Sequence, residues 1–367
     1  MTALHEERTA RLKSAIGEAG LDGVLVYGNA WQCDYLRYAT DFPPLEGDAL
    51  AIVLANGETW IFLDSPTEAD RARRACPDAS VAWSEDIVGT VLRRLEAMGN
   101  RIVATAPATL MPYGIARSDI ARNLTDGTDL IDRLLLNKSP LEVDAVRRAA
   151  ATAARGYRVF MDAVRVGRAE YEVSADVEAF YRAEGCAENF MIMGSGGREV
   201  RGMHPPGERR LQAGDLVTTE LTPCVDGYYA QICRTLVLGE PSAAQLSAFD
   251  VYVEAVQAGY AVLRAGVTAS AVAKAENEVF RRHGLEEYTT SEYTRVRGHG
   301  CGLFVDNKPH ILEDVDTVLG AGATLIVHPN TYHPEVGYMV LGDTVAVTED
   351  GYEDFGSLPL ELLSVPA

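Results

Sequence analysis

A helix-start signal in the middle of the sequence constrains the fold most. Ser139 is followed three residues later by Glu142, a spacing at which each side chain can bond the other's backbone N–H and so cap a helix. Pro140 between them suits the first helical position. Because a chain of 367 residues exceeds what one hydrophobic core normally holds, we place a domain boundary here and predict domains at 1–135 and 136–367.

Strand and helix patterns alternate through the first domain. The pair Asn56-Gly57 separates two apolar runs and supplies the positive φ of a tight turn, so it predicts a β-hairpin. The whole pattern predicts a small α/β domain, with helices at 5–20 and 87–98, the hairpin strands at 49–55 and 59–64, and further strands at 24–27 and 102–105.

The second domain begins with helical patterns and then becomes rich in strands. This order predicts an α+β arrangement in which helices flank one curved sheet. The helices are predicted at 140–164, 170–184, 243–264 and 269–283, and the strands at 190–193, 216–221, 228–238, 324–328 and 338–347.

Composition excludes several classes of function. Hydrophobic residues at 47% and charged residues at 23% are typical of a globular protein, and the apolar runs are too short to span a membrane. A net charge of −20 opposes binding to nucleic acid or to anionic membranes. The six cysteines show no CxxC spacing, and the N-terminal segment lacks the features of a signal peptide, so we expect a cytoplasmic protein that acts on a small molecule.

Four segments in the second part of the chain carry short motifs: 137–142, Gly202-Met203-His204-Pro205, 227–235 and 298–303. Together and in this order, they resemble the pita-bread family, which includes creatinase, aminopeptidase P and prolidase. The first third of the chain also resembles the small N-terminal domain that creatinase and prolidase share. The resemblance implies a creatinase-like N-terminal domain followed by a pita-bread domain. It further implies a homodimer in which the N-terminal domain closes the partner's pocket.

The resemblance also locates the five metal-ligand positions of the metal-dependent members. Two ions ~3.5–4 Å apart need bridging carboxylates to screen their repulsion, and here both bridging positions are neutral. We therefore predict that no metal pair and no other cofactor is bound. The two Asp positions hold Glu220 and Gln231, the His position holds His299, and the two Glu positions hold His328 and Gly342.

A single metal ion is the open alternative at these positions. His299, His328 and Glu220 form a two-histidine, one-carboxylate set, which is a known mononuclear pattern. In the other interpretation, the same side chains only form hydrogen bonds in a former metal cavity.

Four residues are predicted to be catalytic. His204 matches the family's catalytic histidine, and a neutral imidazole with a pKa of ~6.5 can accept and donate a proton. Glu220 would orient a histidine or act as a base on water, unless it forms a salt bridge with Arg234. His299 and His328 would converge with His204, and their mutual repulsion should lower the pKa of at least one of them.

Five further residues are predicted to bind substrate. Gln231 and Asp306 stand at positions that contact metal or substrate in the peptidases, where Asp306 replaces a second histidine. Tyr228 and Tyr229 could donate phenolic hydrogen bonds. Phe42 begins an acidic loop at the position where creatinase carries an arginine, which would suit a cationic or amine-bearing substrate.

These residues lead to one main functional prediction and three alternatives. The prediction is a metal-independent hydrolase that cleaves a carbon–nitrogen bond in a small molecule, such as an amide, an amidine or a related group. The alternatives are a mononuclear-metal Xaa-Pro-type peptidase, a lyase or decarboxylase, and a non-catalytic binding scaffold. The fold does not decide between them, because the replaced positions are the ones that select the chemistry.

Overall fold

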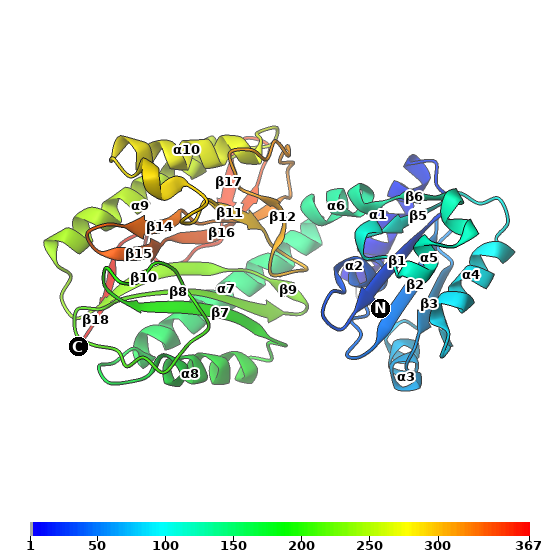
Figure 1. Cartoon of the computed structure of the whole chain (residues 1–367), viewed down its shortest axis with the longest axis horizontal. Helices are drawn as coiled ribbons and strands as arrows, with labels where there is room; N and C mark the ends of the chain where they lie inside the picture. The colour runs from blue at the N-terminus through cyan, green and yellow to red at the C-terminus, as the bar shows by residue number, and fades with distance from the viewer. Residues whose placement is uncertain (1–2) are drawn as a thin grey trace. The chain divides into compact units, whose positions relative to one another are not determined.

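A computed structural model describes residues 3–367 and divides into two compact units, Met1–Leu135 and Leu136–Ala367 (Figure 1). The α/β fold class predicted from the sequence is confirmed.

The N-terminal unit is built on a six-stranded mixed sheet in the order β4-β3-β2-β1-β5-β6. The predicted hairpin is confirmed as β2 and β3, with Gly57 at φ +92° in its turn. The elements are α1 Ala3–Glu18, β1 Gly23–Asn29, α2 Asp34–Thr40, β2 Asp48–Leu54, β3 Thr59–Leu63, α3 Pro66–Ala75, β4 Ser80–Trp83, α4 Ile87–Ala97, β5 Val103–Ala106, η1 Ala108–Leu110, α5 Tyr113–Ala116, η2 Asp119–Asn123, β6 Leu124–Asp126 and α6 Thr128–Leu136.

The C-terminal unit contains a ten-stranded sheet whose main path runs β12-β11-β13-β16-β10-β8-β7, and a separate hairpin of β14 and β15. Its helices are α7 Pro140–Ala163, α8 Glu170–Ala183, α9 Ala243–Val262, α10 Ala269–Arg282 and η3 Glu286–Thr289. Its strands are β7 Asn189–Gly196, β8 Leu216–Val225, β9 Tyr228–Tyr229, β10 Ile232–Leu238, β11 Gly298–Gly300, β12 Asn307–His310, β13 Thr324–Val327, β14 Asn330–His333, β15 Gly337–Val340, β16 Gly342–Val347, β17 Tyr352–Asp354 and β18 Leu363–Val365.

The predicted start of α7 is confirmed. The Ser139 side chain accepts from the Glu142 backbone N–H at 3.2 Å, and the Glu142 carboxylate accepts from the Ser139 N–H at 3.0 Å. The reciprocal bonds satisfy two donors that the first turn of a helix leaves unpaired.

Two helix pairs cover the large sheet. The pair α7 and α8 and the pair α9 and α10 each pack on the strands through a separate apolar core, and Figure 1 shows α8 and α10 at opposite edges of this unit. Along β7 and β8, alternate residues face opposite ways. Met191, Met193 and Leu221 pack into the apolar core under α7 and α8. Ile192 and Glu220, which alternate with them along the strands, line a cavity instead. The Glu220 carboxylate therefore lies on the face of the sheet opposite to this core.

Two predicted strands are each divided in the structure. The segment 228–238 breaks between β9 and β10, where the Gln231 N–H donates to the Thr344 hydroxyl at 2.8 Å. The segment 338–347 breaks at Leu341, because β15 leaves the large sheet to pair with β14. Both breaks fall on buried residues. Leu341 continues the apolar pattern, so that pattern does not reveal the second break.

Candidate active site

The C-terminal unit contains a cavity of ≈ 510 Å³. Five of the predicted site residues line it: Glu220, Gln231, His299, Asp306 and His328. A volume of this size suits a small-molecule ligand.

Strand register brings the cavity residues together. Glu220 of β8 stands between Ile192 of β7 and Cys233 of β10, and Cys233 pairs in turn with Gly342 of β16. On the adjoining strands, His299 pairs with Ile326 of β13. The carboxylate therefore lies in one row across the sheet with the thiol of Cys233.

The carboxyl group of Glu220 is buried, with 7% of the residue exposed. Burial raises its pKa to about 7, and hydrogen bonds with the side chains of Cys233 and Gln231 act against that rise. The Gln231 amide nitrogen also lies 3.3 Å from the Cys233 sulfur. A carboxyl group with this pKa exchanges a proton readily at neutral pH, which is the property of an acid–base catalyst.

This raised pKa has a consequence for stability. Below the ordinary value of 4.5, the carboxyl is protonated in both states and its contribution to folding is fully present. As pH rises through about 7, the folded state loses a proton that it held more tightly than the unfolded state, and on the order of 3 kcal/mol of stability is lost. The stability of the variant Glu220→Gln should not fall in this way, because glutamine does not ionise.

Urea unfolding of the wild type and Glu220→Gln, measured from about pH 4.5 to about pH 8, checks this. The variant should gain stability relative to the wild type as the pH rises. A stability difference that stays constant over this range would show that the pKa of Glu220 is not raised.

Two imidazoles face each other in the cavity. The ring centroids of His299 and His328 lie 5.5 Å apart at an interplanar angle of 73°. The Nδ1 of His299 lies 2.9 Å from the Gly300 carbonyl, to which it donates in the neutral tautomer. The Nδ1 of His328 has no hydrogen-bond partner among the described residues.

Both rings are held in the neutral form. Burial lowers the pKa of His299, opposed by the nearby Asp306 carboxylate. Burial lowers the pKa of His328 further, and the neighbouring His299 adds to the effect. With its Nδ1–H donating to Gly300, neutral His299 can still accept a hydrogen bond at Nε2, and a neutral His328 can donate one and accept one. The pair can therefore hold a polar substrate group.

Asp306 joins His299 to a residue that sequence reasoning missed. Its Oδ1 lies 3.0 Å from the Nε2 of His310 and 3.6 Å from the Nδ1 of His299. His310 matches no family position, and only the pairing of β11 with β12 places it opposite His299.

The structure brings together two of the three predicted catalytic histidines. The His204 side chain is 55% exposed, and its Nδ1 donates to the Pro205 carbonyl at 2.8 Å and lies 3.9 Å from Glu170. The neighbouring Gly202 and Met203 line the cavity, whereas His204 is not among its lining residues.

The remaining predicted substrate-binding residues lie elsewhere. The Tyr228 hydroxyl donates to Glu142 at 3.0 Å, and the Tyr229 hydroxyl donates to Glu188. Both tyrosines are buried packing residues outside the lining of the cavity. Phe42 belongs to the N-terminal unit and is fully buried there.

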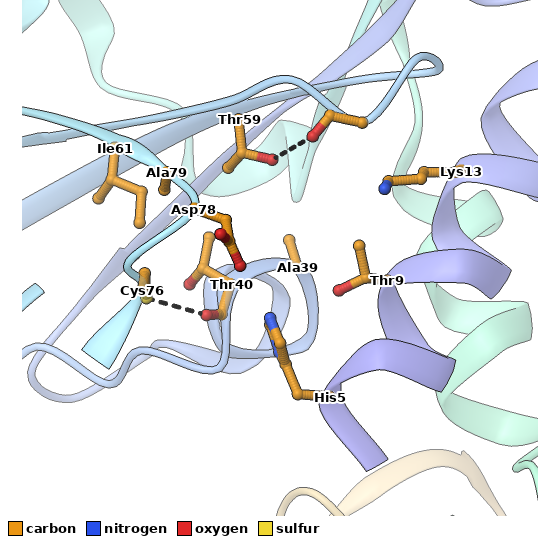
Figure 2. Close-up of a pocket in the computed structure, with 11 residues that line it drawn as sticks. His5, Thr9, Lys13, Ala39, Thr40, Thr59, Ile61, Cys76, Asp78 and Ala79 are labelled. Atoms are coloured by element: carbon orange, nitrogen blue, oxygen red, sulfur yellow. Dashed lines mark hydrogen bonds between the residues drawn. The ribbon is translucent and has the colours of Figure 1, made fainter. Parts of the chain in front are cut away.

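The N-terminal unit has a smaller cavity of its own, of ≈ 240 Å³. Figure 2 shows His5, Thr9 and Lys13 extending from α1 toward it. The Cys76 thiol donates to the Thr40 carbonyl at 3.2 Å, and burial raises its pKa to about 11. A thiol with this pKa is a poor nucleophile at neutral pH, and the predicted site residues do not line this cavity.

The comparisons with known proteins cover both units. Residues 144–349 match the model of metallopeptidase family M24, and residues 8–134 match the creatinase/prolidase N-terminal domain. The chain belongs to metallopeptidase family M24. The predicted resemblance to creatinase, aminopeptidase P and prolidase is therefore confirmed.

Individual M24 relatives resemble the chain over its whole length. "Probable dipeptidase PepE" of Mycobacterium tuberculosis is 30% identical over 99% of this chain and 97% of its own length. "Xaa-Pro dipeptidase" of Pyrococcus furiosus is 27% identical over 98% of this chain and 100% of its own. The crystal structure of dipeptidase PepE from Mycobacterium ulcerans superposes with a TM-score of 0.83 at 27% identity, and covers 100% of this chain and 99% of that one.

These M24 relatives correct the functional prediction. The predicted reaction class, hydrolysis of a carbon–nitrogen bond, agrees with the names of these relatives, because a peptide bond is a carbon–nitrogen bond. The prediction of a metal-independent hydrolase acting on an amide or amidine is wrong, because the family model and the relatives' names point to peptidases.

M24 membership implies a metal pair, and the residues present do not fit one. A Cβ added at Gly342 would lie 2.0 Å from the Val327 carbonyl oxygen and 2.7 Å from the His328 Cα, so the backbone leaves no room for a carboxylate side chain. Gln231 supplies a neutral amide at the other bridging position. Within residues 3–367, no three His, Cys, Asp or Glu side chains are close enough together to hold an ion.

Two further findings bear on the sequence predictions. Arg234 pairs with Asp343 at 2.6 Å, so it is not engaged in the salt bridge considered for Glu220.

In the part of the chain that the structure describes, no helix combines the length and apolar character needed to cross a membrane.

Proposed function

We propose that this chain is a peptidase that hydrolyses short peptides, in the manner of the dipeptidases and Xaa-Pro dipeptidases that it resembles. The observation that carries the proposal is the likeness to PepE, 30% identity over 99% of the chain. The cavity adds support, because a carboxyl group with a raised pKa and two neutral imidazoles line it together.

The residues of the cavity can carry out a hydrolysis. In its ionised form, Glu220 removes a proton from water as the water oxygen bonds to the peptide carbonyl carbon. The same group returns that proton to the amine as the carbon–nitrogen bond breaks, which is the usual double use of one acid–base group. His299 and His328 hold the polarised carbonyl or the leaving amine, and Asp306 attracts a positively charged amino terminus.

Three expectations from the sequence stay as parts of this proposal. His204 follows the cavity-lining Met203 directly, which supports a role as a proton carrier at the rim. The resemblance to creatinase-like dimers supports a homodimer in which the loop of Phe42 reaches the partner, and light scattering tests the dimer. Cysteine spacing supports a cytoplasmic location.

A panel of dipeptides tests the proposed function. Purified chain is incubated with Xaa-Pro and Xaa-Leu dipeptides, with N-acetylated versions of the same peptides and with creatine, both as isolated and after addition of a divalent metal. The proposal predicts release of amino acids from the unblocked dipeptides. Folded protein that cleaves no dipeptide under any of these conditions would refute it.

A further inference from the structure

Arg201 adjoins the lining of the cavity in sequence and has no assigned role. We propose that Arg201 binds the carboxylate of the substrate, which restricts the enzyme to short peptides with an unblocked C-terminus. The inference rests on the proposed peptidase function and adds to it a specificity-determining residue.

The guanidinium of Arg201 is stacked on two tyrosines. Its Cζ lies 5.2 Å from the ring centroid of Tyr332 and 5.9 Å from that of Tyr293. The two rings are themselves stacked with centroids 6.0 Å apart, and Tyr288 packs edge-on against Tyr293. A cation–π contact uses none of the N–H donors of the guanidinium as a hydrogen bond would, so these donors remain available for a planar partner.

All three stacked residues adjoin the cavity in sequence. Arg201 immediately precedes the lining residue Gly202, Tyr293 immediately precedes the lining residue Thr294, and Tyr332 follows the lining residue Asn330 by two positions. Three separate segments of the chain therefore converge at the place where the cation is held.

Hydrogen bonds fix the loop that carries Arg201. The Tyr332 hydroxyl donates to the Arg198 carbonyl at 2.9 Å, and the Tyr338 backbone N–H donates to the Val200 carbonyl at 3.0 Å. Tyr338 also lines the cavity. A guanidinium that is already held in place loses less conformational entropy when it binds a ligand.

The charge of Arg201 has no protein partner. The side chain is exposed and forms no ion pair or hydrogen bond with any residue from 3 to 367. By contrast, Arg295, which also adjoins Thr294, is paired with Asp314 at 3.1 Å. An arginine that is stacked but unpaired offers its fork of donors to a carboxylate, which it can bind with two parallel hydrogen bonds.

The surrounding charges favour the same orientation of the substrate. Glu220 and Asp306 line the cavity, and no Lys or Arg is among its lining residues. In a chain of net charge −20, an anion is repelled from most of the surface. On this proposal, the carboxylate of a dipeptide binds to Arg201 beside the cavity lining, and its ammonium group lies toward the carboxylates of the cavity.

Steady-state kinetics test this with one dipeptide as the free acid and as its C-terminal amide. For Arg201→Gln, KM for the free acid should rise about 10- to 100-fold with kcat nearly unchanged, while KM for the amide stays as in the wild type. For Arg201→Lys, KM for the free acid should rise less than for Arg201→Gln, because lysine keeps the positive charge but not the planar guanidinium.

Arg198→Gln is the matched control, since it removes the same charge from the same exposed loop and keeps the backbone carbonyl that accepts from the Tyr332 hydroxyl. An equal rise in KM for both variants would show a general charge effect and overturn the inference. So would an unchanged KM in Arg201→Gln.

Calorimetric titration of the same two ligands into Glu220→Gln separates the inference from the function. In this variant the free acid should bind more tightly than the amide, and the difference should disappear when Arg201→Gln is introduced into the same protein. That result supports the carboxylate site even if no peptide is cleaved. Binding of the acid no tighter than that of the amide overturns the site even if peptides are cleaved.

Discussion

Replacing Glu220 with Gln is expected to lower kcat for dipeptide hydrolysis by about 10²- to 10⁴-fold, the usual contribution of general acid–base catalysis. The amide has nearly the shape of the carboxyl group and can keep contacts with Cys233 and Gln231. It cannot take a proton from water or return one to the amine. The loss should therefore fall on kcat, and KM should change little.

The control for this variant is Glu349→Gln, which removes an exposed carboxylate from the same unit. It should leave kcat unchanged. A folded Glu220→Gln protein with wild-type kcat would show that the proton transfer takes place on another group. In the wild type, kcat/KM should rise as pH increases through about 7, because the base must be ionised.

Replacing Arg234 with Met should destabilise the fold by about 3–5 kcal/mol, the cost of breaking a buried ion pair. Arg234 and Asp343 are almost fully buried, with side-chain exposures of 0% and 4%. The guanidinium also donates to the carbonyls of Cys233 and Gly342 at 2.9 and 2.8 Å. The variant would leave the Asp343 charge buried without a partner and release the junction of β10 and β16.

The matched control for that variant is Arg73→Met. Arg73 pairs with Asp70 at 2.6 Å, but both side chains are at least half exposed. Pairs of this kind contribute about 0–1 kcal/mol. Urea unfolding compares the two variants, and a loss below about 1 kcal/mol for Arg234→Met would show that the buried pair does not hold the strands together.

Local signals in the sequence were enough for the main elements of the fold. The bonds between Ser139 and Glu142 depend only on residues three apart, and the hairpin turn at Gly57 depends only on local backbone freedom. The family motifs then identify Glu220, His299 and His328 as candidates for one site, and all three line the same cavity.

Contacts across the sheet could not be predicted in the same way. Cys233 lies beside Glu220 because of the register of β8 and β10, which no local pattern specifies. His310 lies opposite His299 because β11 pairs with β12. The direction of His204 depends on how its loop bonds to neighbouring groups, and the stacking of Arg201 depends on residues about 90 and 130 positions away.

The central claim is that this M24 chain hydrolyses peptides at a site whose residues do not hold a pair of metal ions. Dipeptide turnover and divalent metal content, measured by elemental analysis on the same purified preparation, test it most directly. The account predicts turnover from protein that contains fewer than two bound ions per chain. Two tightly bound ions per chain, with activity that disappears and returns as they are removed and restored, would contradict it.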